Sequence, residues 1–198
     1  VVSELIDEMT RSKKLCRYLH LPIQYGHDEI LKRMGRKYHV ADCVALIEKA
    51  KRLVPEITIG TDIIVGFPGE TNDHFEETCR LLSDLPLDYF HVFSFSARHR
   101  ARAKDFPNQV SKIKMQERSR RLRHLSLRKR SISYTNHLGK IVSVLFEQNK
   151  NGHWLGVTDH FVHVAVPATP KTNLKNTIRR VRLERVKGQL VLGKLVSP

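Results

Sequence analysis

From Ile57 to Thr71 the chain reads ITIGTDIIVGFPGET, and this stretch decides the class of fold. Its first nine residues are mostly β-branched, which favours a buried strand, and Gly66 ends the run. Thr71 is a residue type that caps helices, and the apolar spacing that follows predicts a helix to Asp84. A strand followed directly by an amphipathic helix is the repeating unit of a parallel α/β sheet.

The same alternation continues on both sides of this stretch. Apolar spacing predicts helices over residues 2–9 and 40–54, and strands over residues 18–23, 57–65 and 89–95. Three such βα units cannot close a barrel alone, so we expect part of a larger barrel. The fold class is therefore α/β, with a partial (βα) barrel ending in a long basic helix near residue 134.

After that helix, which we predict over residues 110–133, the pattern changes abruptly. Five short strands separated by turn residues are predicted over residues 140–147, 153–157, 161–166, 177–186 and 189–196. Five antiparallel strands in about 60 residues make a barrel of the OB-like size, which often binds oligonucleotides. The sequence therefore predicts two domains, residues 1–134 and residues 135–198.

The net charge of +15 is distributed very unevenly. Residues 1–97 carry 12 basic and 15 acidic side chains, whereas residues 98–130 carry 13 and 2, and residues 131–198 carry 10 and 3. A basic excess confined to one part of a globular chain is typical of nucleic-acid binding. A solvated basic helix is the alternative, and an anionic membrane fits poorly because no apolar face with Trp or Phe anchors accompanies the charge.

The three cysteines, Cys16, Cys43 and Cys79, have neither zinc-site nor redox-motif spacing. Cys43 and Cys79 lie on apolar stripes, which predicts small buried residues of a cytoplasmic protein. We expect no metal site within the chain. We also expect no membrane partner, because no apolar run is long enough to cross a bilayer and the first residues do not resemble a signal peptide.

Chemistry-bearing residues follow the predicted strands, and active sites of βα barrels form at these carboxyl ends. Gly66 lets the backbone approach a ligand closely, and Glu70 could tie down the loop or accept a hydrogen bond from a ligand. Gln24 offers donors and an acceptor, and Arg98 could clamp a carboxylate or phosphate. Each of these residues alone is more often an ordinary turn or surface residue. Because such residues follow three consecutive strands, the ligand-binding interpretation and the turn or surface interpretation are about equally favoured.

Three segments resemble a known family. LHLPIQYGHDEILKRMGR (residues 19–36), TDIIVGFPGET (61–71) and HVFSFSAR (91–98) resemble the fourth, fifth and sixth strand segments of the radical S-adenosylmethionine methylthiotransferases. The terminal barrel, with WLGVT at residues 154–158, is similar to their TRAM domain. The resemblance covers nearly the whole chain, and it is closest to the type that acts on threonylcarbamoyladenosine in tRNA.

The resemblance implies a tRNA methylthiotransferase that adds a methylthio group to C2 of N6-threonylcarbamoyladenosine near the anticodon. It implies S-adenosylmethionine and 4Fe-4S clusters as cofactors, with an adenosyl radical abstracting the C2 hydrogen and a second cluster supplying the methylthio sulfur. In such enzymes the strand ends cradle S-adenosylmethionine. The residues that match these positions, the last two through their backbone, are Gln24, Gly26, Gly66, Glu70, Arg98, Val92 and Phe93.

Three departures from the family pattern stand out. The Cys-x-x-x-Cys-x-x-Cys motif and the sulfur-donor domain are absent, so we expect the cluster ligands upstream, in a missing N-terminal half, and this chain alone should be inactive. The family's Gln-Ser-Gly-Ser is Gln24-Tyr25-Gly26-His27 here. Its Arg-Pro-Gly-Thr is Arg98-His99-Arg100-Ala101. The last two changes lie at the mouth of the barrel, where the substrate is expected.

Arginines of two segments are candidates for RNA phosphate contacts, which position RNA without reading its sequence. They are Arg118, Arg120, Arg121 and Arg123 on the basic helix, and Arg179, Arg180, Arg182 and Arg185 on one predicted strand. Alternation along that strand puts Arg180 and Arg182 on one face and Arg179 and Arg185 on the other. Aromatic residues for base stacking are sparse, so we expect backbone and shape readout; Phe146, Trp154 and Phe161 are the candidates, and Trp154 fits the core equally well.

Two other functions stay open. A non-catalytic RNA-binding protein would keep the scaffold without clusters, and a cysteine motif upstream of residue 1 would argue against it. A methylthiotransferase could instead act on a ribosomal protein. Residues 98–198 carry 23 basic and 5 acidic side chains, a net charge of +18, which favours RNA.

Overall fold

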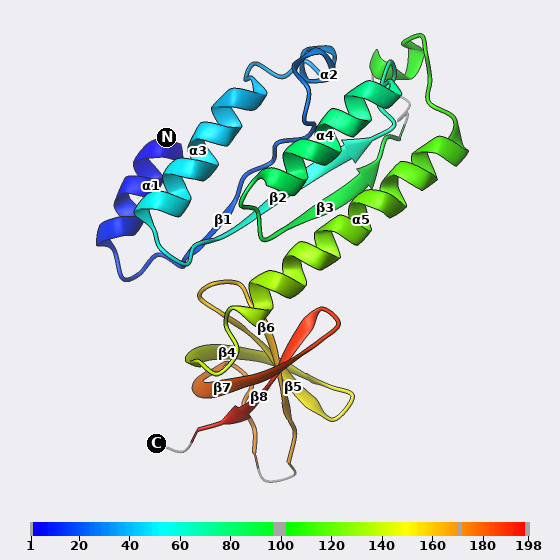
Figure 1. Cartoon of the computed structure of the whole chain (residues 1–198). Coiled ribbons are helices and arrows are strands. Elements are labelled where there is room, and N and C mark those ends of the chain that lie inside the picture. Colours follow the sequence, from blue (N-terminus) through cyan, green and yellow to red (C-terminus); the bar gives the residue numbers. More distant parts are fainter. Residues whose placement is uncertain (1, 97–101, 170–171, 197–198) are drawn as a thin grey trace.

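The computed structural model describes residues 2–96, 102–169 and 172–196, which form a larger α/β unit and a smaller all-β unit (Figure 1). The α/β unit contains α1 (Val2–Arg11), β1 (Tyr18–His20), α2 (Asp28–Arg33), α3 (Val40–Leu53), β2 (Thr58–Val65), α4 (Asn72–Asp84), β3 (Tyr89–Ser94), η1 (Arg102–Asp105) and α5 (Lys112–Thr135). Among the described residues, no helix combines the length and the apolar character needed to cross a membrane.

The predicted βα alternation is present, with a few differences. The short helices α2 and η1 were not predicted. The first strand ends at His20 instead of continuing to residue 23, because Pro22 has no amide hydrogen to donate to a sheet. The chain rejoins the sheet at Gln24, which forms an isolated parallel bridge with Ile63.

The three strands are parallel and lie in the order β1-β2-β3. Side chains alternate between the two faces of such a sheet. Ile59, Ile63 and Val65 of β2 pack on one face in a single core with residues of α1, α3, α4 and α5. This core fixes the carboxyl ends of the strands, where the predicted site residues lie.

Helix α5 packs against the α/β unit through only some of its apolar residues. Leu122 is fully buried and Leu125 half-buried, but Ile113 and Ile132 are 79% and 63% exposed. The buried face follows the helical repeat through Leu122 and contains polar residues instead, namely Arg118, Ser119, Ser126 and Ser133. Apolar periodicity could not reveal a helix whose buried face is largely polar.

Ser126 explains one of these polar positions. Strand β3 pairs only with β2, so its outer backbone groups have no neighbouring strand. The Ser126 hydroxyl accepts a hydrogen bond from the Phe90 amide at 2.9 Å and donates one to the Phe90 carbonyl at 2.6 Å. Arg123 donates to the Val92 carbonyl at 3.3 Å. Side chains of α5 therefore replace the missing strand at the edge of the sheet.

The all-β unit contains β4 (Ile141–Lys150), β5 (His153–Thr158), β6 (His163–Pro167), β7 (Thr177–Lys187) and β8 (Leu190–Leu195). They form the predicted closed barrel, in the order β4-β5-β6-β8-β7. The prediction that all five strands pair antiparallel was wrong, because β6 and β8 are parallel. An odd number of strands cannot alternate in direction around a closed ring, so one pair must be parallel.

The barrel core settles two questions that the sequence left open. Phe146 and Trp154 are buried in it, and the Trp154 indole donates to the Thr172 carbonyl at 3.1 Å. Neither ring is therefore a surface for base stacking. Tyr134 of α5 packs into the same core, so the proposed domain boundary after residue 134 falls within the last turn of the helix.

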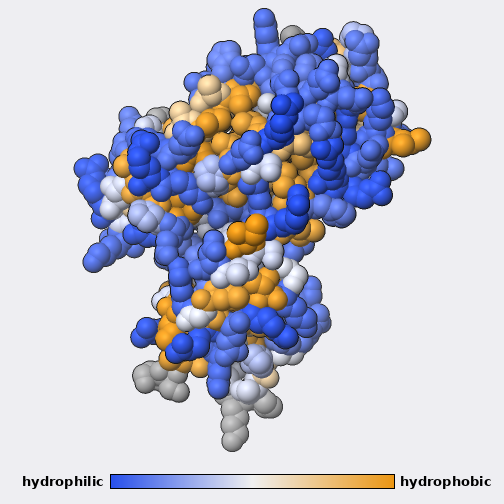
Figure 2. Space-filling model, in the orientation of Figure 1, coloured by the Kyte–Doolittle hydropathy of each residue, from blue (hydrophilic) through white to orange (hydrophobic). Residues whose placement is uncertain are grey.

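The two units meet at a narrow waist (Figure 2). Ser133 donates to Asp88 at 2.8 Å, and Arg130 donates to Gln189 in the β7–β8 hairpin at 2.8 Å. Lys140 also pairs with Glu56. These contacts join α5 to the α/β unit on one side and to the barrel on the other.

The prediction that Cys43 and Cys79 are buried is confirmed. Cys43 and Cys79 are buried within the α/β core and Cys16 is exposed, and all three are free thiols. Burial raises the pKa of Cys79 to about 11, so its thiol stays protonated at neutral pH.

The role of Ser126 gives a first prediction. Ser126→Ala should lower the free energy of unfolding by about 1–3 kcal/mol, because it leaves the buried amide and carbonyl of Phe90 without a partner. Urea unfolding would measure the loss. Ser131→Ala, on the exposed side of the same helix, is the matched control, and equal effects of the two substitutions would contradict the proposed role.

The histidines near the waist give a second prediction. Burial lowers the pKa of His91, His137 and His163 below the usual 6.5. The unfolded chain therefore binds more protons than the native state just below pH 6.5, so the free energy of unfolding should fall as the pH drops through this range. Urea unfolding between about pH 7.5 and 5.5 would measure it. His137→Gln should make the dependence shallower, and an unchanged slope would count against this account.

Candidate functional site

The carboxyl ends of β1 and β2 bring Gln24 and Gly66 to the same edge of the sheet. The backbone amide of Gln24 donates to the Asp62 carbonyl at 2.9 Å, and the backbone carbonyl of Gln24 accepts from the Ile64 amide at 2.8 Å. Its φ of 70° lies in the left-handed region, which is unusual for a residue with a side chain. The side-chain carbonyl of Gln24 accepts from Arg36 at 3.2 Å. The half-buried side-chain amide of Gln24 is thus held at the edge of the sheet where β1 and β2 end.

Glu70 is the centre of the loop between β2 and α4. One carboxylate oxygen accepts hydrogen bonds from the amides of Gly66 and Phe67, the latter at 3.1 Å. Burial raises the pKa of Glu70, while Arg118 and these amides lower it by stabilising the ionised form. Tyr25 is fully buried nearby, and burial followed by the Glu70 charge raises the pKa of its phenol. Glu70 therefore ties down the loop, the first of the two roles considered for it.

The prediction that Arg118 contacts RNA was wrong. Its guanidinium lies 3.0 Å from Glu70, with both side chains almost completely buried, and it also donates to Asn72 at 2.8 Å. Such a guanidinium cannot meet a phosphate in solution without breaking a buried ion pair. Arg118 instead fastens α5 to the start of α4.

The two predicted cofactor glycines serve packing within the protein. A Cβ on Gly26 would lie 2.9 Å from the Cα of Thr78, so this glycine lets the chain pass close to α4. Gly66 has a φ of 78°, and a Cβ there would collide with Met115 of α5. The close approach that we predicted for a ligand is thus made by neighbouring protein segments.

Three predicted residues lie on or after β3. The Val92 carbonyl already accepts a hydrogen bond from Arg123, so this backbone group is occupied. Phe93 is exposed, and its backbone pairs with Ile64 of β2. Arg98 lies outside the described residues. Of the predicted cofactor set, Gln24 and Phe93 remain the best placed to contact a ligand.

The other arginines of α5 differ in how they are held. Arg121 forms a two-pronged ion pair with Glu76, one contact of which measures 2.7 Å. Arg123 is exposed and reaches back to β3, and Arg120 is exposed on the same helix. Part of the basic charge of this helix is therefore used to hold the fold together.

All four arginines of β7 are exposed. The prediction that Arg179 and Arg185 lie on the same face of the strand was wrong, because β7 has a bulge between Leu183 and Arg185. The extra residue shifts the alternation, so that Leu183 and Val186 both face the barrel core and Arg185 turns outward with Arg180 and Arg182.

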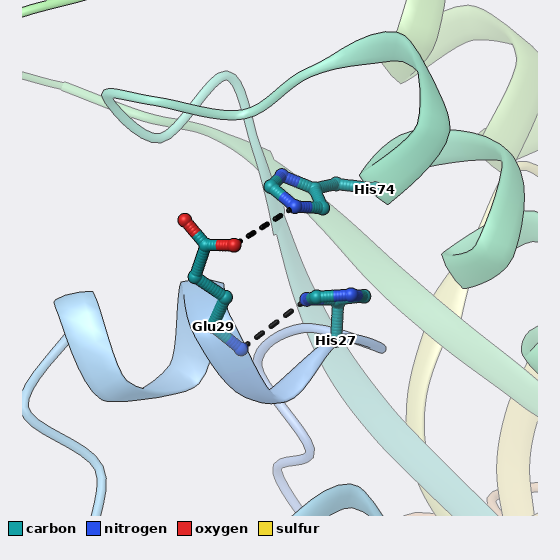
Figure 3. Close-up of side chains that lie close together, drawn as sticks. All are labelled: His27, Glu29 and His74. Carbon is teal, nitrogen blue, oxygen red and sulfur yellow. Dashed lines mark hydrogen bonds and ion pairs between the residues drawn. The ribbon is translucent and has the colours of Figure 1, made fainter.

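A group of polar side chains that the sequence did not reveal lies at the starts of α2 and α4 (Figure 3). His27, Glu29 and His74 each place a potential metal-ligand atom within 4.8 Å of the others. Nε2 of His74 lies 3.4 Å from Glu29, and Nε2 of His27 lies 3.4 Å from Glu77. Only the unusual His27 pointed to this cluster, because its partners come from two separate segments.

Hydrogen bonding explains this cluster without a metal. Nδ1 of His27 accepts from the Glu29 amide at 3.2 Å, and Nδ1 of His74 accepts from the Thr71 amide at 3.3 Å. These contacts fit rings that carry a proton on Nε2, which then donates to the facing carboxylate. The cluster caps two helices and holds α2 against α4.

The three cysteines do not form an iron–sulfur site. Cys43 and Cys79 are buried in the apolar core, and Cys16 is exposed just before β1. An iron–sulfur cluster needs several thiolates around one space. Within the described residues, no group of three cysteines provides it.

The Glu70–Arg118 pair gives a third prediction. Arg118→Leu should lower the free energy of unfolding by about 3–5 kcal/mol, because it leaves a buried carboxylate without its cation. Arg120→Leu, on the exposed face of α5, is the matched control and should change stability by about 0.5 kcal/mol or less. Combining Arg118→Leu with Glu70→Gln should restore part of the loss in urea unfolding. A double variant no more stable than Arg118→Leu alone would contradict the pairing.

Comparisons with known proteins found one matching family model and many similar sequences. The model of the radical SAM superfamily matches residues 1–82. The chain is 34% identical over 196 residues to a threonylcarbamoyladenosine tRNA methylthiotransferase of Chlamydia pneumoniae, covering 99% of this chain and 46% of the relative. It is 31% identical over 188 residues to a tRNA-2-methylthio-N(6)-dimethylallyladenosine synthase of Treponema denticola, covering 93% and 42%. A synthase of the same name from Thermoanaerobacter sp. is 42% identical over 148 residues, covering 74% and 31%.

The chain thus spans less than half the length of these curated relatives. The similarity nevertheless runs along nearly the whole of it, through both the α/β unit and the barrel. The chain is thus homologous, along nearly its whole length, to radical S-adenosylmethionine tRNA methylthiotransferases.

Proposed function

We propose that this chain is part of an enzyme that adds a methylthio group to C2 of N6-threonylcarbamoyladenosine near the anticodon of tRNA. The observation that carries this proposal is the match over 99% of the chain to a relative named for that activity. Relatives named for dimethylallyladenosine make that modified adenosine the second candidate substrate. The basic second half of the chain supports an RNA substrate over a ribosomal protein.

The proposal gives each unit a task. The three parallel strands and their helices would be the C-terminal half of the radical barrel, and the closed five-strand barrel would be a TRAM-type RNA-binding domain. The first half of the enzyme would supply the remaining strands and the cluster cysteines, because the cysteines of this chain are dispersed. An isolated chain would then bind RNA without modifying it.

This chain would contribute to S-adenosylmethionine binding through few groups. Gln24 is suited to bind the cofactor with its side-chain amide, and Phe93, at the end of the neighbouring strand pair, would contribute through its backbone only. Gly26, Gly66 and Glu70 would act indirectly, because they set the shape of the strand-end loops. When bound, the cofactor and its cluster would supply the radical chemistry of the family.

RNA would dock along the exposed arginines of β7 and α5. Arg180, Arg182 and Arg185 face outward from the barrel, and Arg120 and Arg123 are exposed on the helix. Arg118 takes no part in this surface. Because these contacts would be to phosphates, binding should weaken steeply as salt is added.

Two measurements test the proposal. Mass spectrometry of tRNA nucleosides from cells lacking the gene should show loss of the methylthio derivative of threonylcarbamoyladenosine; loss of the dimethylallyl derivative instead would point to the second candidate. Filter binding of tRNA to the protein that carries this chain should give a steep salt dependence. Unchanged levels of methylthio nucleosides, together with tRNA binding that depends steeply on salt, would favour a non-catalytic RNA-binding protein.

A further inference from the structure

Aromatic side chains of both units meet at the waist and continue along β3. We call Phe161, Tyr89, His91 and Phe93 the aromatic strip. Ring centroids of neighbours along it are separated by 6.5, 5.3 and 6.4 Å, and Tyr18 stacks on Phe161 at 4.2 Å. Such spacing makes one continuous row of rings running from the barrel to the end of β3.

Local geometry holds the strip in place. Tyr89, His91 and Phe93 are alternate residues of one strand, so their side chains share a face of the sheet. A Cβ on Gly60 of β2 would lie 2.6 Å from the Tyr89 ring, so only glycine lets that ring lie over the neighbouring strand. The hydroxyls of Tyr18 and Tyr89 lie 2.6 Å apart, which fixes the anchored end.

The strip passes from buried to exposed along its length. Tyr89 is 5% exposed, beneath the waist, whereas His91 is exposed and Phe93 is 52% exposed. A large apolar ring that is half exposed on a rigid strand is available to another flat ring. The exposed end lies beside α5, on the side of that helix that carries Arg123 and Arg130.

A groove of about 290 Å³ runs between β3 and α5, and it joins the strip to these cations. Its lining includes His91, Phe93, Arg123, Leu127, Arg130 and Gln189, and none of the described residues that line it is acidic. The Arg130 guanidinium lies 4.3 Å from the Tyr89 ring centroid and is held by Gln189 of the β7–β8 hairpin. This contact brings the groove next to the strand that carries Arg185.

We propose that this groove holds an unpaired nucleotide of RNA, with its base stacked on Phe93 and His91 and its phosphates next to Arg123 and Arg130. The inference rests on the proposed function, since it names the RNA structure that the enzyme would recognise. Aromatic rings next to basic side chains are suited to single-stranded nucleic acid, because its bases are free to stack on the rings while its phosphates contact the cations. A duplex hides the faces of its bases and would meet only the arginines.

This proposal revises the expectation of shape readout alone. The sequence contains few aromatic residues in its basic half, and two of the three candidates, Phe146 and Trp154, are buried in the barrel core. The rings of the strip come mainly from β3, which precedes the basic region. Folding brings them to the cations through α5.

Phe93→Trp tests stacking directly. The one tryptophan of this chain, Trp154, is buried, so the fluorescence that Phe93→Trp adds to that of the unaltered protein would report on the groove. The protein that carries this chain should be titrated with an RNA hairpin that has an unpaired loop, and with the same stem closed into a continuous duplex. Hairpin binding should quench the added fluorescence, and duplex binding should leave it unchanged.

Affinity measurements separate stacking from charge. Phe93→Ala should weaken binding of the hairpin about tenfold or more while leaving the dependence on salt unchanged, and Phe93→Trp should retain the affinity. Arg123→Gln should instead reduce the slope of log affinity against log salt by about one. Ile113→Ala removes an apolar side chain that is even more exposed, 79% against 52% for Phe93, near the start of α5, and it should leave binding unaltered.

The outcomes distinguish this inference from the proposed function. Suppose that the affinity of the unaltered protein for tRNA depends steeply on salt, but Phe93→Ala does not change that affinity. The groove then does not hold a base, while the proposed function stands. Absence of quenching with full hairpin affinity would overturn the inference in the same way and would indicate that a protein segment covers the strip. Absence of any tRNA binding would defeat the proposed function and this inference together.

Discussion

The buried ion pair between Glu70 and Arg118 is the constraint on which the arrangement of the α/β unit depends. Glu70 gathers the amides at the end of β2, and Arg118 binds that carboxylate from α5. The pair therefore fixes the long helix to the loop where the predicted cofactor residues lie. Neither charge could be buried alone, because an unpaired ion in this environment costs several kcal/mol.

Once its first half is fixed, α5 organises the rest of the molecule through polar contacts. Ser126 completes the edge of β3, Ser133 binds Asp88, and Arg130 reaches the barrel hairpin. Directional contacts of this kind define the position of a helix along its axis better than apolar packing does. The barrel thereby acquires a defined place relative to the sheet, although each unit has its own hydrophobic core.

Local sequence signals predicted most of the elements but few of the roles of polar residues. Thr71 marked the start of α4, and β-branched residues marked β2, because both effects act over a few neighbouring positions. The role of Arg118 was missed, since its partner lies 48 positions earlier in the chain. Gly66 was identified as a site of close approach, but only the fold reveals that Met115, and not a ligand, approaches it.

The net charge of the basic half overstates the surface that is open to RNA. Arg118 is buried against Glu70, and Arg121 is paired with Glu76, so two of the four arginines that seemed most concentrated serve the protein itself. The cations that remain lie beside β3 and on β7, at either side of the waist. Binding by charge alone would be spread thinly over this surface. The rings of the aromatic strip lie between these cations. Unlike charge, stacking on these rings would distinguish an unpaired base from any other part of an RNA molecule.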